Sequence, residues 1–535
     1  MPPQSIERYR EAFESSTLTR EQFTALLATA SEADALRRQV EWFKRQLFGQ
    51  KSERRLIEPD PTQGTLGQTF EAMPADRPGH AKVKVDAHER ERKPKQPAAE
   101  REESAPFFDE AKVPVEVIEV PNPEIAQLAA DQYEIIGEKV THRLAQRPGS
   151  YVVLKYVRQV VKRRDTQQLV CAPAPVGVID GSRADVSFIA GMMVDKLVYH
   201  LPLHRQHQRL QAAGLRVSRQ WLTQLMQTGA QLLEPVYGAQ EASVRRSRVK
   251  AMDETPIKAG LAAPGKMRPA YFWPIYGEHD EICFPYFPDR KWGNVEAILG
   301  LKPPDRAVLV SDGFGAYAEY AAKVGLTHAL CWVHSRRELY DARDIEPQLV
   351  AQALAMIGEL YAIEDEIRDR GLRGEAKRVH RQSQSRPKVE TFLRWVDTQF
   401  GRQGLLPSSP FTKALAYIRE RRDGLQVYLD DPDVPMDTNH LERALRRIPL
   451  GRKNWMFCWT ELGARHIGML QSLLTTCRLH EIDPYDYLVD VLQRIGQHPA
   501  SRVEELTPRR WKQLYAANPM RSPVDTRASP VKNAA

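Results

Sequence analysis

The sequence of 535 residues predicts an α/β fold, in which a mixed β-sheet forms the core and a helical insertion interrupts it. Three short runs of alternating or β-branched residues follow one another, and two more flank a helix at 317–324. These five runs lie at 247–252, 270–276, 281–287, 307–311 and 327–333. Three strands in succession and then strand–helix–strand are typical of a mixed sheet with helices. Apolar positions at helical spacing then fill 345–430, so we expect a core domain over 245–455 with an insertion at 340–437.

Composition and charge narrow the class of protein. The chain carries 77 Lys and Arg residues against 69 Asp and Glu, a net charge of +8, and 42% of it is hydrophobic. This is a globular composition, which excludes collagen, a disulfide scaffold and a fully disordered chain. Five scattered cysteines, an odd number, indicate a reduced, intracellular protein. With a polar N-terminal region and no apolar run long enough to cross a bilayer, we expect a cytoplasmic protein with no membrane association.

The two ends of the chain are expected to be simpler than its centre. Apolar residues over 33–47 step by three and four, which predicts a basic, coiled-coil-like helical region over 1–55. That helix either dimerises or contacts DNA. Alternatively, it packs on its own protein and leaves its charged face in solvent. Residues 56–105 have few large apolar side chains, so we expect a disordered linker. Beyond the core domain we expect a helical region over 456–500 and a flexible tail over 501–535.

Two small modules are expected between the linker and the core domain. Residues 106–185 contain alternating runs rich in Val and Tyr and predict a small β-rich domain. Residues 186–240 predict a helix-turn-helix, because two helical segments flank a turn at Gly214 and Ser218 can cap the second helix. An ordinary helical hairpin has the same pattern. The cationic side chains that would face DNA in this region are Arg205, Arg209, Arg216 and Arg219.

Three acidic residues stand where a cleft is expected. Asp253 and Asp312 each end a β run just before a turn-forming Pro or Gly, and Glu442 lies one turn inside a helix with a capping residue. Three converging carboxylates repel one another unless cations neutralise them, and hard oxygen ligands suit Mg²⁺ or Mn²⁺. Two such ions support phosphoryl transfer. Taken singly, each acid also has a structural explanation: a strand-end cap for Asp253, an Asx turn for Asp312 and an ion pair with Arg446 for Glu442.

Basic and aromatic residues surround these acids. Positive charge gathers before Asp253, after His334 and around Glu442. Clustered Arg and Lys serve phosphate contacts, and a Trp offers a surface for an unstacked base. We therefore expect phosphate contacts from Arg336, Arg337, Arg443, Arg446, Arg452 and Lys453, and a stacking or wedge role for Trp455. A metal site in basic surroundings indicates a substrate that brings its own negative charge, such as DNA.

The same segments carry a family likeness. The chain resembles the DDE transposases of the bacterial insertion-sequence 66 family in LRRQVEWFKRQLFGQKSER (36–54), KLVYHLPLHRQ (196–206), MDETP (252–256), SDGFGAY (311–317) and CWVHSRR (331–337). The most specific block is TNHLERALRRIPLGRKNW (438–455). These segments follow the family's order over most of residues 30–490.

The resemblance implies a chemistry and a set of partners. It implies a ribonuclease-H-like catalytic core in which Asp253, Asp312 and Glu442 are catalytic and hold two Mg²⁺ or Mn²⁺ ions. The implied reaction is metal-dependent hydrolysis at transposon ends, followed by attack of the released 3′-hydroxyls on target DNA. Expected partners are double-stranded DNA, further copies of the chain on that DNA, and small accessory proteins of the same element.

The chain departs from the family in one respect, and two alternative functions fit the same residues. Relatives usually carry two Cys-x-x-Cys pairs before the helix-turn-helix, whereas residues 106–170 contain no cysteine and Cys171 stands alone. We therefore expect no zinc, and the β-rich domain has to fold on its own core or differ in shape. The rivals are a DNA-binding regulator with inert acids and a metal-dependent nuclease without strand transfer. The interrupted sheet domain favours the transposase, because a regulator has no need of it.

Overall fold

The computed structural model of the chain describes residues 107–526, apart from 110–112, 127, 130–131, 148, 264–265, 403–404 and 455–457. The chain divides into two units, 1–106 and 107–535, and the described residues belong to the second. The helical region predicted over 1–55, the linker predicted over 56–105 and the predicted stacking residue Trp455 lie outside the described residues.

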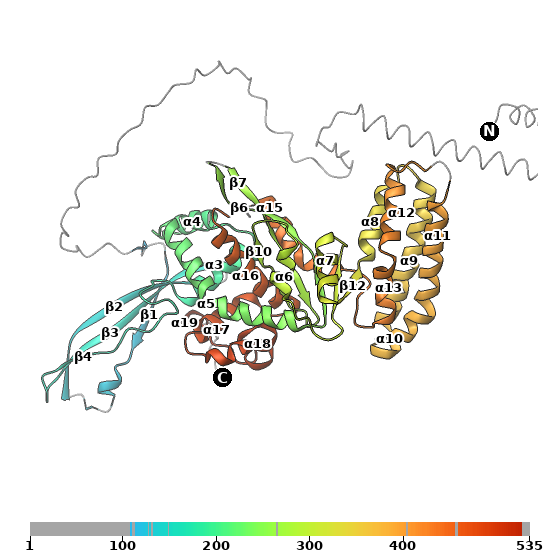
Figure 1. Ribbon diagram of the computed structural model, residues 1–535. Coiled ribbons are helices and arrows are strands. Elements are labelled where there is room, and N and C mark those ends of the chain that lie inside the picture. The colour runs from blue at the N-terminus through green and yellow to red at the C-terminus, as the bar shows by residue number, and fades with distance from the viewer. Residues whose placement is uncertain are drawn as a thin grey trace, which may run out of the picture. The chain divides into compact units, whose positions relative to one another are not determined.

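A five-stranded mixed sheet forms the centre of the second unit (Figure 1). Its strands are β5 (Val249–Met252), β8 (Ile275–Gly277), β9 (Ile282–Cys283), β11 (Val308–Ser311) and β12 (Thr327–Leu330). The strand order is β12-β11-β5-β8-β9. Strands β5, β8 and β9 are antiparallel neighbours, whereas β11 runs parallel to both β5 and β12. The predicted α/β fold with a mixed sheet is therefore confirmed.

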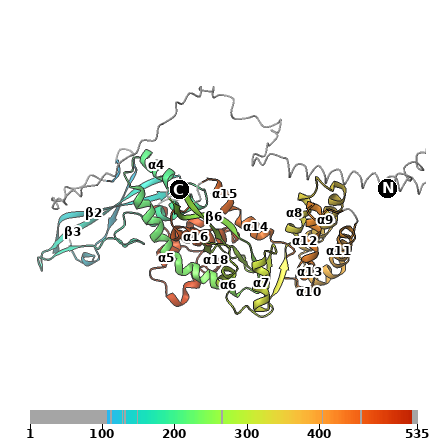
Figure 2. The ribbon, with the colours of Figure 1, turned by 45° about the horizontal axis from the view of Figure 1, so that its top comes forward.

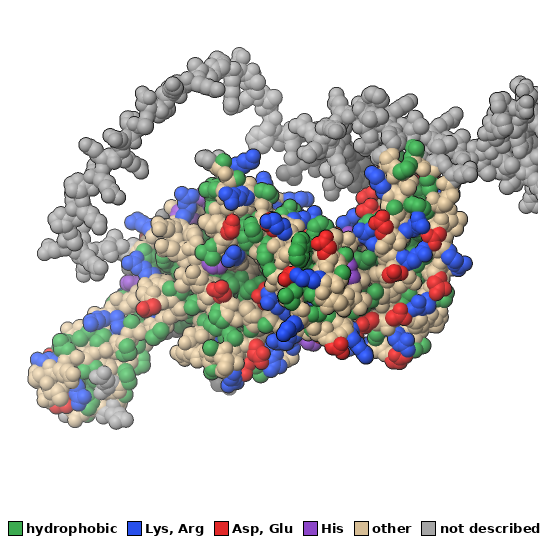
Figure 3. All heavy atoms as spheres, viewed as in Figure 1, with side chains coloured by type: hydrophobic (Ala, Val, Ile, Leu, Met, Phe, Trp, Pro, Cys, Tyr) green, Lys and Arg blue, Asp and Glu red, His purple; other side chains and the backbone are tan. Residues whose placement is uncertain are grey.

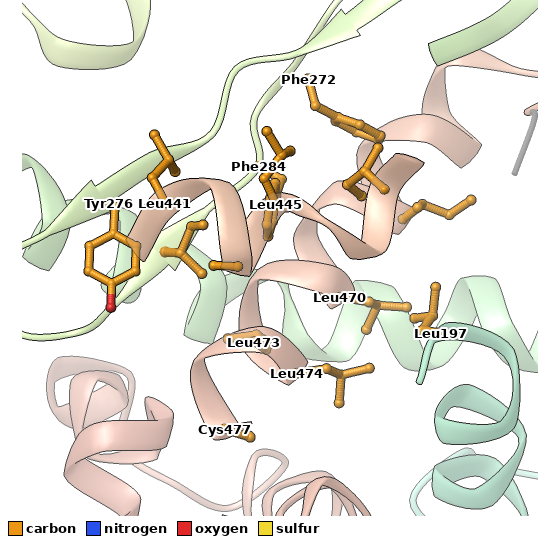
Figure 4. Close-up of a cluster of buried hydrophobic side chains, with 14 of the residues drawn as sticks. Leu197, Phe272, Tyr276, Phe284, Leu441, Leu445, Leu470, Leu473, Leu474 and Cys477 are labelled. Carbon is orange, nitrogen blue, oxygen red and sulfur yellow. The ribbon is translucent and has the colours of Figure 1, made fainter. Parts of the chain in front are cut away.

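Helices cover both faces of this sheet. Met252 and Leu309 pack in one buried cluster with residues of α6 (Gly293–Leu299) and α7 (Gly315–Val324). The alternating residues Ala251 and Val310 belong to a larger cluster on the other face, which includes α14 (Asn439–Leu445) and α16 (Glu461–Leu479). Figure 4 shows part of that cluster, where Tyr276 and Phe284 lie beside the leucines of α14 and α16. The sheet is thus buried on both faces, which explains why its central strands β5 and β11 are mostly apolar.

A second, antiparallel sheet was not expected. It consists of β6 (Thr255–Ala263), β7 (Lys266–Phe272) and β10 (Tyr286–Phe287), in the order β10-β7-β6. The single strand predicted over 270–276 is wrong, because β7 ends at Phe272 and β8 begins only after Pro274, which has no N–H for a ladder. The strand predicted over 281–287 likewise divides into β9 and β10. Strand β6 escaped prediction because it is rich in Ala and contains Gly260.

The predicted insertion is a helical bundle that packs beside β12 (Figure 1). Its helices are α8 (Trp332–Asp341), α9 (Pro347–Asp369), α10 (Gly374–His380), α11 (Arg386–Phe400), α12 (Pro410–Glu420) and α13 (Arg422–Asp430), with a π-helical turn at Arg381–Ser385. Val350 and Ile357 of one predicted apolar stripe, and Val389, Phe392 and Val396 of the other, are buried. The bundle starts earlier than expected, since Trp332 begins α8 rather than continuing a strand.

The N-terminal sheet has the order β1-β3-β2, with β4 also beside β3. Its strands are β1 (Val115–Val120), β2 (Tyr133–Arg147), β3 (Ser150–Arg163) and β4 (Leu169–Cys171). Leu144 and Val153 belong to the same buried cluster as the helix-turn-helix region, and Tyr156 packs in a small cluster with Val524. This sheet therefore shares its apolar contacts with distant parts of the chain rather than forming a core of its own.

The helical region that follows has the predicted helix–turn–helix pattern. Helix α3 (Val186–Leu197) precedes α4 (Leu203–Ala212) and α5 (Arg219–Arg246). Gly214 has a φ of +89°, a conformation that favours glycine, and the Ser218 hydroxyl accepts a hydrogen bond from the backbone N–H of Trp221. Helix α5 extends beyond the module predicted over 186–240, because it continues to Arg246, close to the start of the central sheet. No described helix combines the length and the apolar character that a bilayer crossing requires.

The flexible tail predicted over 501–535 is wrong as far as residue 526. After α17 (Pro484–Arg494), a 3-10 helix (Ala500–Leu506), α18 (Pro508–Leu514) and α19 (Pro523–Thr526) follow. Trp511 is buried and its indole N–H donates to Asp490, which is fully buried. Val524 packs against the N-terminal sheet. The proline and arginine content of this segment suggested fraying, but a few large apolar anchors hold it in place.

Candidate active site

Two of the three predicted acids lie side by side at one edge of the central sheet. Asp253 follows β5 and Asp312 follows β11, and these strands are parallel neighbours in which Ala251 pairs with Val310. The carboxyl ends of parallel strands meet at the same edge, so the sheet itself brings the two carboxylates together. The Asp312 carboxylate also accepts a hydrogen bond of 2.9 Å from the N–H of Phe314, so its predicted Asx turn is present as well.

A third carboxylate, which the sequence reasoning missed, completes this cluster. Oxygens of Asp253, Glu254 and Asp312 lie within 4.8 Å of one another. Glu254 directly follows Asp253, and the acidic pair at a strand end was the signal that could have identified it. Its side chain is only 4% exposed. The edge of the sheet therefore presents three carboxylates rather than two.

Glu254 has fixed partners that its neighbours lack. The Tyr317 hydroxyl donates to it at 2.7 Å, and the Arg290 guanidinium forms an ion pair with it. Burial and the Glu254 carboxylate together raise the pKa of Tyr317 well above its usual value, so this phenol stays a hydrogen-bond donor. Arg290 also lies over the Phe314 ring, 4.2 Å from the ring centroid, and remains 45% exposed. Arg290 thus places a guanidinium at the rim of the acidic cluster.

Glu442, the third predicted acid, comes from a different element. It lies in the first turn of α14, where Asp437 accepts a hydrogen bond of 3.0 Å from the N–H of Asn439. Its oxygens lie 3.9 Å from His334 Nε2 and 3.8 Å from Arg337 Nη2, both on α8. The basic side chains nearest its carboxylate are therefore on another helix, and Arg446 is not among them. In the described part of the chain, the buried Oε1 of Glu442 has no hydrogen-bond partner.

The electrostatics tie all four carboxylates into one site. The pKa of Asp253 is raised to about 7, chiefly by burial and also by the charges of Glu254, Asp312 and Glu442, against the lowering effect of a backbone hydrogen bond. Like charges that share a low-dielectric site disfavour ionisation unless a cation joins them. The group is thus a set of hard oxygen donors with excess negative charge, which is the chemistry that a divalent cation takes up.

The helical insertion supports the loop that carries Asp312. Tyr417 of α12 donates its hydroxyl to the backbone oxygen of Asp312, and Arg421 donates to that of Gly313 at 3.2 Å. Gly313 has a φ of +88°, and a Cβ there would lie 2.6 Å from Arg421 Nε. A side chain at this position would therefore collide with its support.

The predicted DNA contacts fall into three exposed groups. Arg336 and Arg337 lie on α8, Arg219 lies at the start of α5, and Arg205 lies on α4. The remaining four belong to α14, to α15 (Arg447–Asn454) or to the turn between them, and these are Arg443, Arg446, Arg452 and Lys453. All eight side chains are exposed.

The group on α15 lies next to the group on α4, although the two helices are far apart in the sequence. Arg205 Nη1 contacts the Asn454 side-chain oxygen at 3.4 Å, and Asn454 donates to the backbone oxygen of His200 at 3.1 Å. Arg447 donates to the backbone oxygen of Val198 at 3.1 Å. The end of α15 therefore lies against the start of the helix-turn-helix region. These contacts place the predicted phosphate ligands Arg205, Arg452 and Lys453 in one neighbourhood.

The chain matches models of a transposase family. A model of the family described as "Transposase IS66 family" matches residues 181–466, "IS66 C-terminal element" matches 472–509, and "Transposase C of IS166 homeodomain" matches 35–116. Three uncharacterized proteins of Sinorhizobium fredii (strain NBRC 101917 / NGR234) are among its relatives. Protein y4hP is 29% identical over 91% of this chain and 90% of its own length. Protein y4qI is 30% identical over 74% of this chain and 75% of its own length. Protein y4jD is 28% identical over 89% of this chain and 94% of its own length.

Proposed function

The chain belongs to the IS66 transposase family, and from this premise we propose that it binds the ends of an insertion sequence and catalyses metal-dependent DNA cleavage and strand transfer. In this proposal the mixed sheet is a ribonuclease-H-like core, and Asp253, Asp312 and Glu442 are its catalytic acids. The observation that carries it is the pairing of Asp253 and Asp312 at one edge of the sheet, in a carboxylate cluster whose charge is coupled to that of Glu442 on α14. Asp253 and Asp312 are far apart in the sequence, and the parallel pairing of β5 with β11 brings them together.

The donor set fits Mg²⁺ or Mn²⁺. Asp253 and Asp312 offer carboxylate oxygens within 4.8 Å of each other, and Glu442 offers a buried oxygen without a hydrogen-bond partner in the described residues. We propose that these three hold two ions. Such ions would activate the attacking oxygen and stabilise the leaving one. Because Glu254 is already engaged by Tyr317 and Arg290, we assign it to positioning rather than to the metal.

The chain's own residues then bind and orient the substrate. Arg337, beside Glu442, would contact the phosphate nearest the cut, and the exposed cations of α14 and α15 would hold the flanking backbone. The helix-turn-helix, with Arg205 and Arg219, would recognise the element's end. We further propose that the protein acts in the cytoplasm as more than one copy on DNA, with small accessory proteins of the same element.

The test is a cleavage assay on a labelled duplex that carries one end of the element, taken from the DNA that flanks the gene. We expect Asp312→Asn to abolish cleavage in Mg²⁺ while end binding stays measurable, because the substitution removes a metal ligand and leaves the basic surfaces intact. Asp365→Asn, an exposed acid on α9 paired with Arg368, is the matched control. Cleavage by Asp312→Asn at the rate of the control would refute the assignment.

A second candidate is a DNA-binding regulator in which the acids are structural. The α4–α5 pair, in which Ser218 caps α5, favours it, because helix-turn-helix pairs of this kind serve DNA binding in regulators. A regulator would bind the duplex but show no nicking with Mg²⁺ or Mn²⁺. A nuclease without strand transfer would nick the duplex and yet fail to join a pre-cut end to a target plasmid.

A further inference from the structure

The β6–β7 hairpin is an addition to the central sheet rather than a part of it. It leaves the sheet at Thr255, two residues after Asp253, and β8 resumes the sheet at Ile275. Its strands pair with each other from Thr255 and Phe272 at the base to Ala263 and Lys266 near the tip. Figure 1 shows the hairpin projecting beyond the helices around it. The central sheet does not require the projecting hairpin, so we expect another role for it.

The base of the hairpin is held firmly. Ile257, Ala259 and Ala270 are buried, and the backbone of Cys458 pairs with β6 through Lys258 and Gly260 at 2.9 Å each. Arg452 of α15 donates to the backbone oxygen of Pro256 at 2.8 Å. Figure 2 shows β6 beside α15. These contacts fix the direction of the hairpin relative to α15 and to Asp253.

The outer part of the hairpin is exposed and positively charged. Lys258, Lys266 and Arg268 are all exposed. The sequence has no Asp or Glu from 255 to 277, and none from 443 to 460, the stretch that includes α15. Figure 3 shows blue Lys and Arg side chains on the ridge where Figure 1 places β7. Two segments that contain no acid thus lie side by side next to the candidate active site, with Glu461 of α16 beside Gly260 at their edge.

We propose that the β6–β7 hairpin and α15 form a DNA-binding arm, in which Lys258, Lys266 and Arg268 contact the phosphates that flank the scissile bond. The proposal rests on the proposed function. A two-stranded ribbon fits the major groove of DNA, and the exposed Lys and Arg side chains of the hairpin strands match the charge of a phosphate backbone. The hairpin offers no Asn or Gln side chain from 255 to 272, so its contacts add affinity but little sequence preference.

The experiment measures binding of a fluorescein-labelled, mixed-sequence duplex at several salt concentrations. Each phosphate contact contributes about 0.9 to the slope of log K against log salt. We expect K258Q/K266Q/R268Q to lower the slope by about 2 to 3, by a similar amount on duplexes of different sequence. The matched control is K302Q/R394Q/K413Q, which removes the same charge from exposed positions outside the hairpin and α15. Equal losses in both variants would show a mere effect of net charge and overturn the proposal.

Folding and function are read out separately. Both triple variants are melted to confirm an unchanged transition, and if the hairpin variant melts early, Lys266→Gln alone is compared with Lys302→Gln. An unchanged slope in the well-folded hairpin variant also overturns the arm. Cleavage of the element's end in Mg²⁺ is followed in parallel. If the wild type binds DNA with the hairpin-dependent slope but never cleaves, the proposed function fails and the arm stands.

Discussion

The acids of the candidate site are held in place in two different ways. Asp253 and Asp312 extend from neighbouring parallel strands, so the hydrogen-bond register of the sheet fixes their separation. Glu442 lies on a short helix that follows the insertion, and its position depends on side chains of α8 and on the segment that leads from α13 to α14. The comparison teaches that half of the site is built into the core, while the other half depends on how the bundle packs.

The largest expected effect comes from removing the main tie of the bundle. The Arg381 guanidinium is fully buried, pairs with Glu364, and donates to the backbone oxygens of Tyr428 and Val434 just before α14. Because Arg381→Met leaves Glu364 and these oxygens without their partner, we expect it to destabilise the protein by about 3–5 kcal/mol. Chemical denaturation checks this value. Arg378→Met, an exposed arginine paired with Glu375, should change stability by less than about 1 kcal/mol.

A second prediction concerns pH and the sheet-borne half of the site. The pKa of Asp253 is raised to about 7 in the folded protein from an ordinary value of 3.8, so the folded state binds more protons than the unfolded state between these values. Stability of the metal-free protein should therefore fall as pH rises from about 4 to about 7, by at most about 4 kcal/mol.

Two additions sharpen this prediction. Asp253→Asn should flatten the pH dependence and stabilise the metal-free protein at neutral pH, because it removes a charge that the fold disfavours. Mg²⁺ should raise the melting temperature of the wild type at pH 8 and not that of Asp253→Asn. If the melting temperatures of the wild type and of Asp253→Asn changed with pH by the same amount, this account would be contradicted.

The smallest expected effect tests the rim of the acidic cluster. Arg290 orients Glu254 and lies at the edge of the metal-binding group, so we expect Arg290→Ala to weaken Mg²⁺ affinity or cleavage by about 10–100-fold. Arg343→Ala is a close match, since Arg343 is also 45% exposed and lies 4.1 Å from the centroid of the Tyr340 ring. The dependence of the cleavage rate on Mg²⁺ concentration distinguishes the two variants. Identical curves would show that Arg290 has no role in the site.

Sequence reasoning reached the sheet-borne half of the site more readily than the rest. Asp253 and Asp312 each follow a short, mostly apolar run and precede a turn-forming residue, so their positions at strand ends could be predicted. Arg290 could not, because it lies in a loop where no periodicity links it to Glu254. The hairpin was missed because β6 has β-branched residues only at Thr255 and Ile257, and Ala and Gly follow where a strand signal would be needed. The tail was misread because Trp511 and Val524 are isolated apolar residues whose partners lie far away in the sequence.

The contacts of the last helices with the first sheet set an order for synthesis. Tyr485 donates to the backbone oxygen of Gln146, and Ser522 donates to Asp185, the residue that caps α3. The apolar side chains of the N-terminal sheet and of α3 thus find their last partners only when the ribosome has passed residue 524. A chain that lacked residues 485–524 would leave the N-terminal sheet and α3 without these partners and exposed to proteases. The N-terminal sheet therefore depends for its packing on a segment that lies far from it in the sequence.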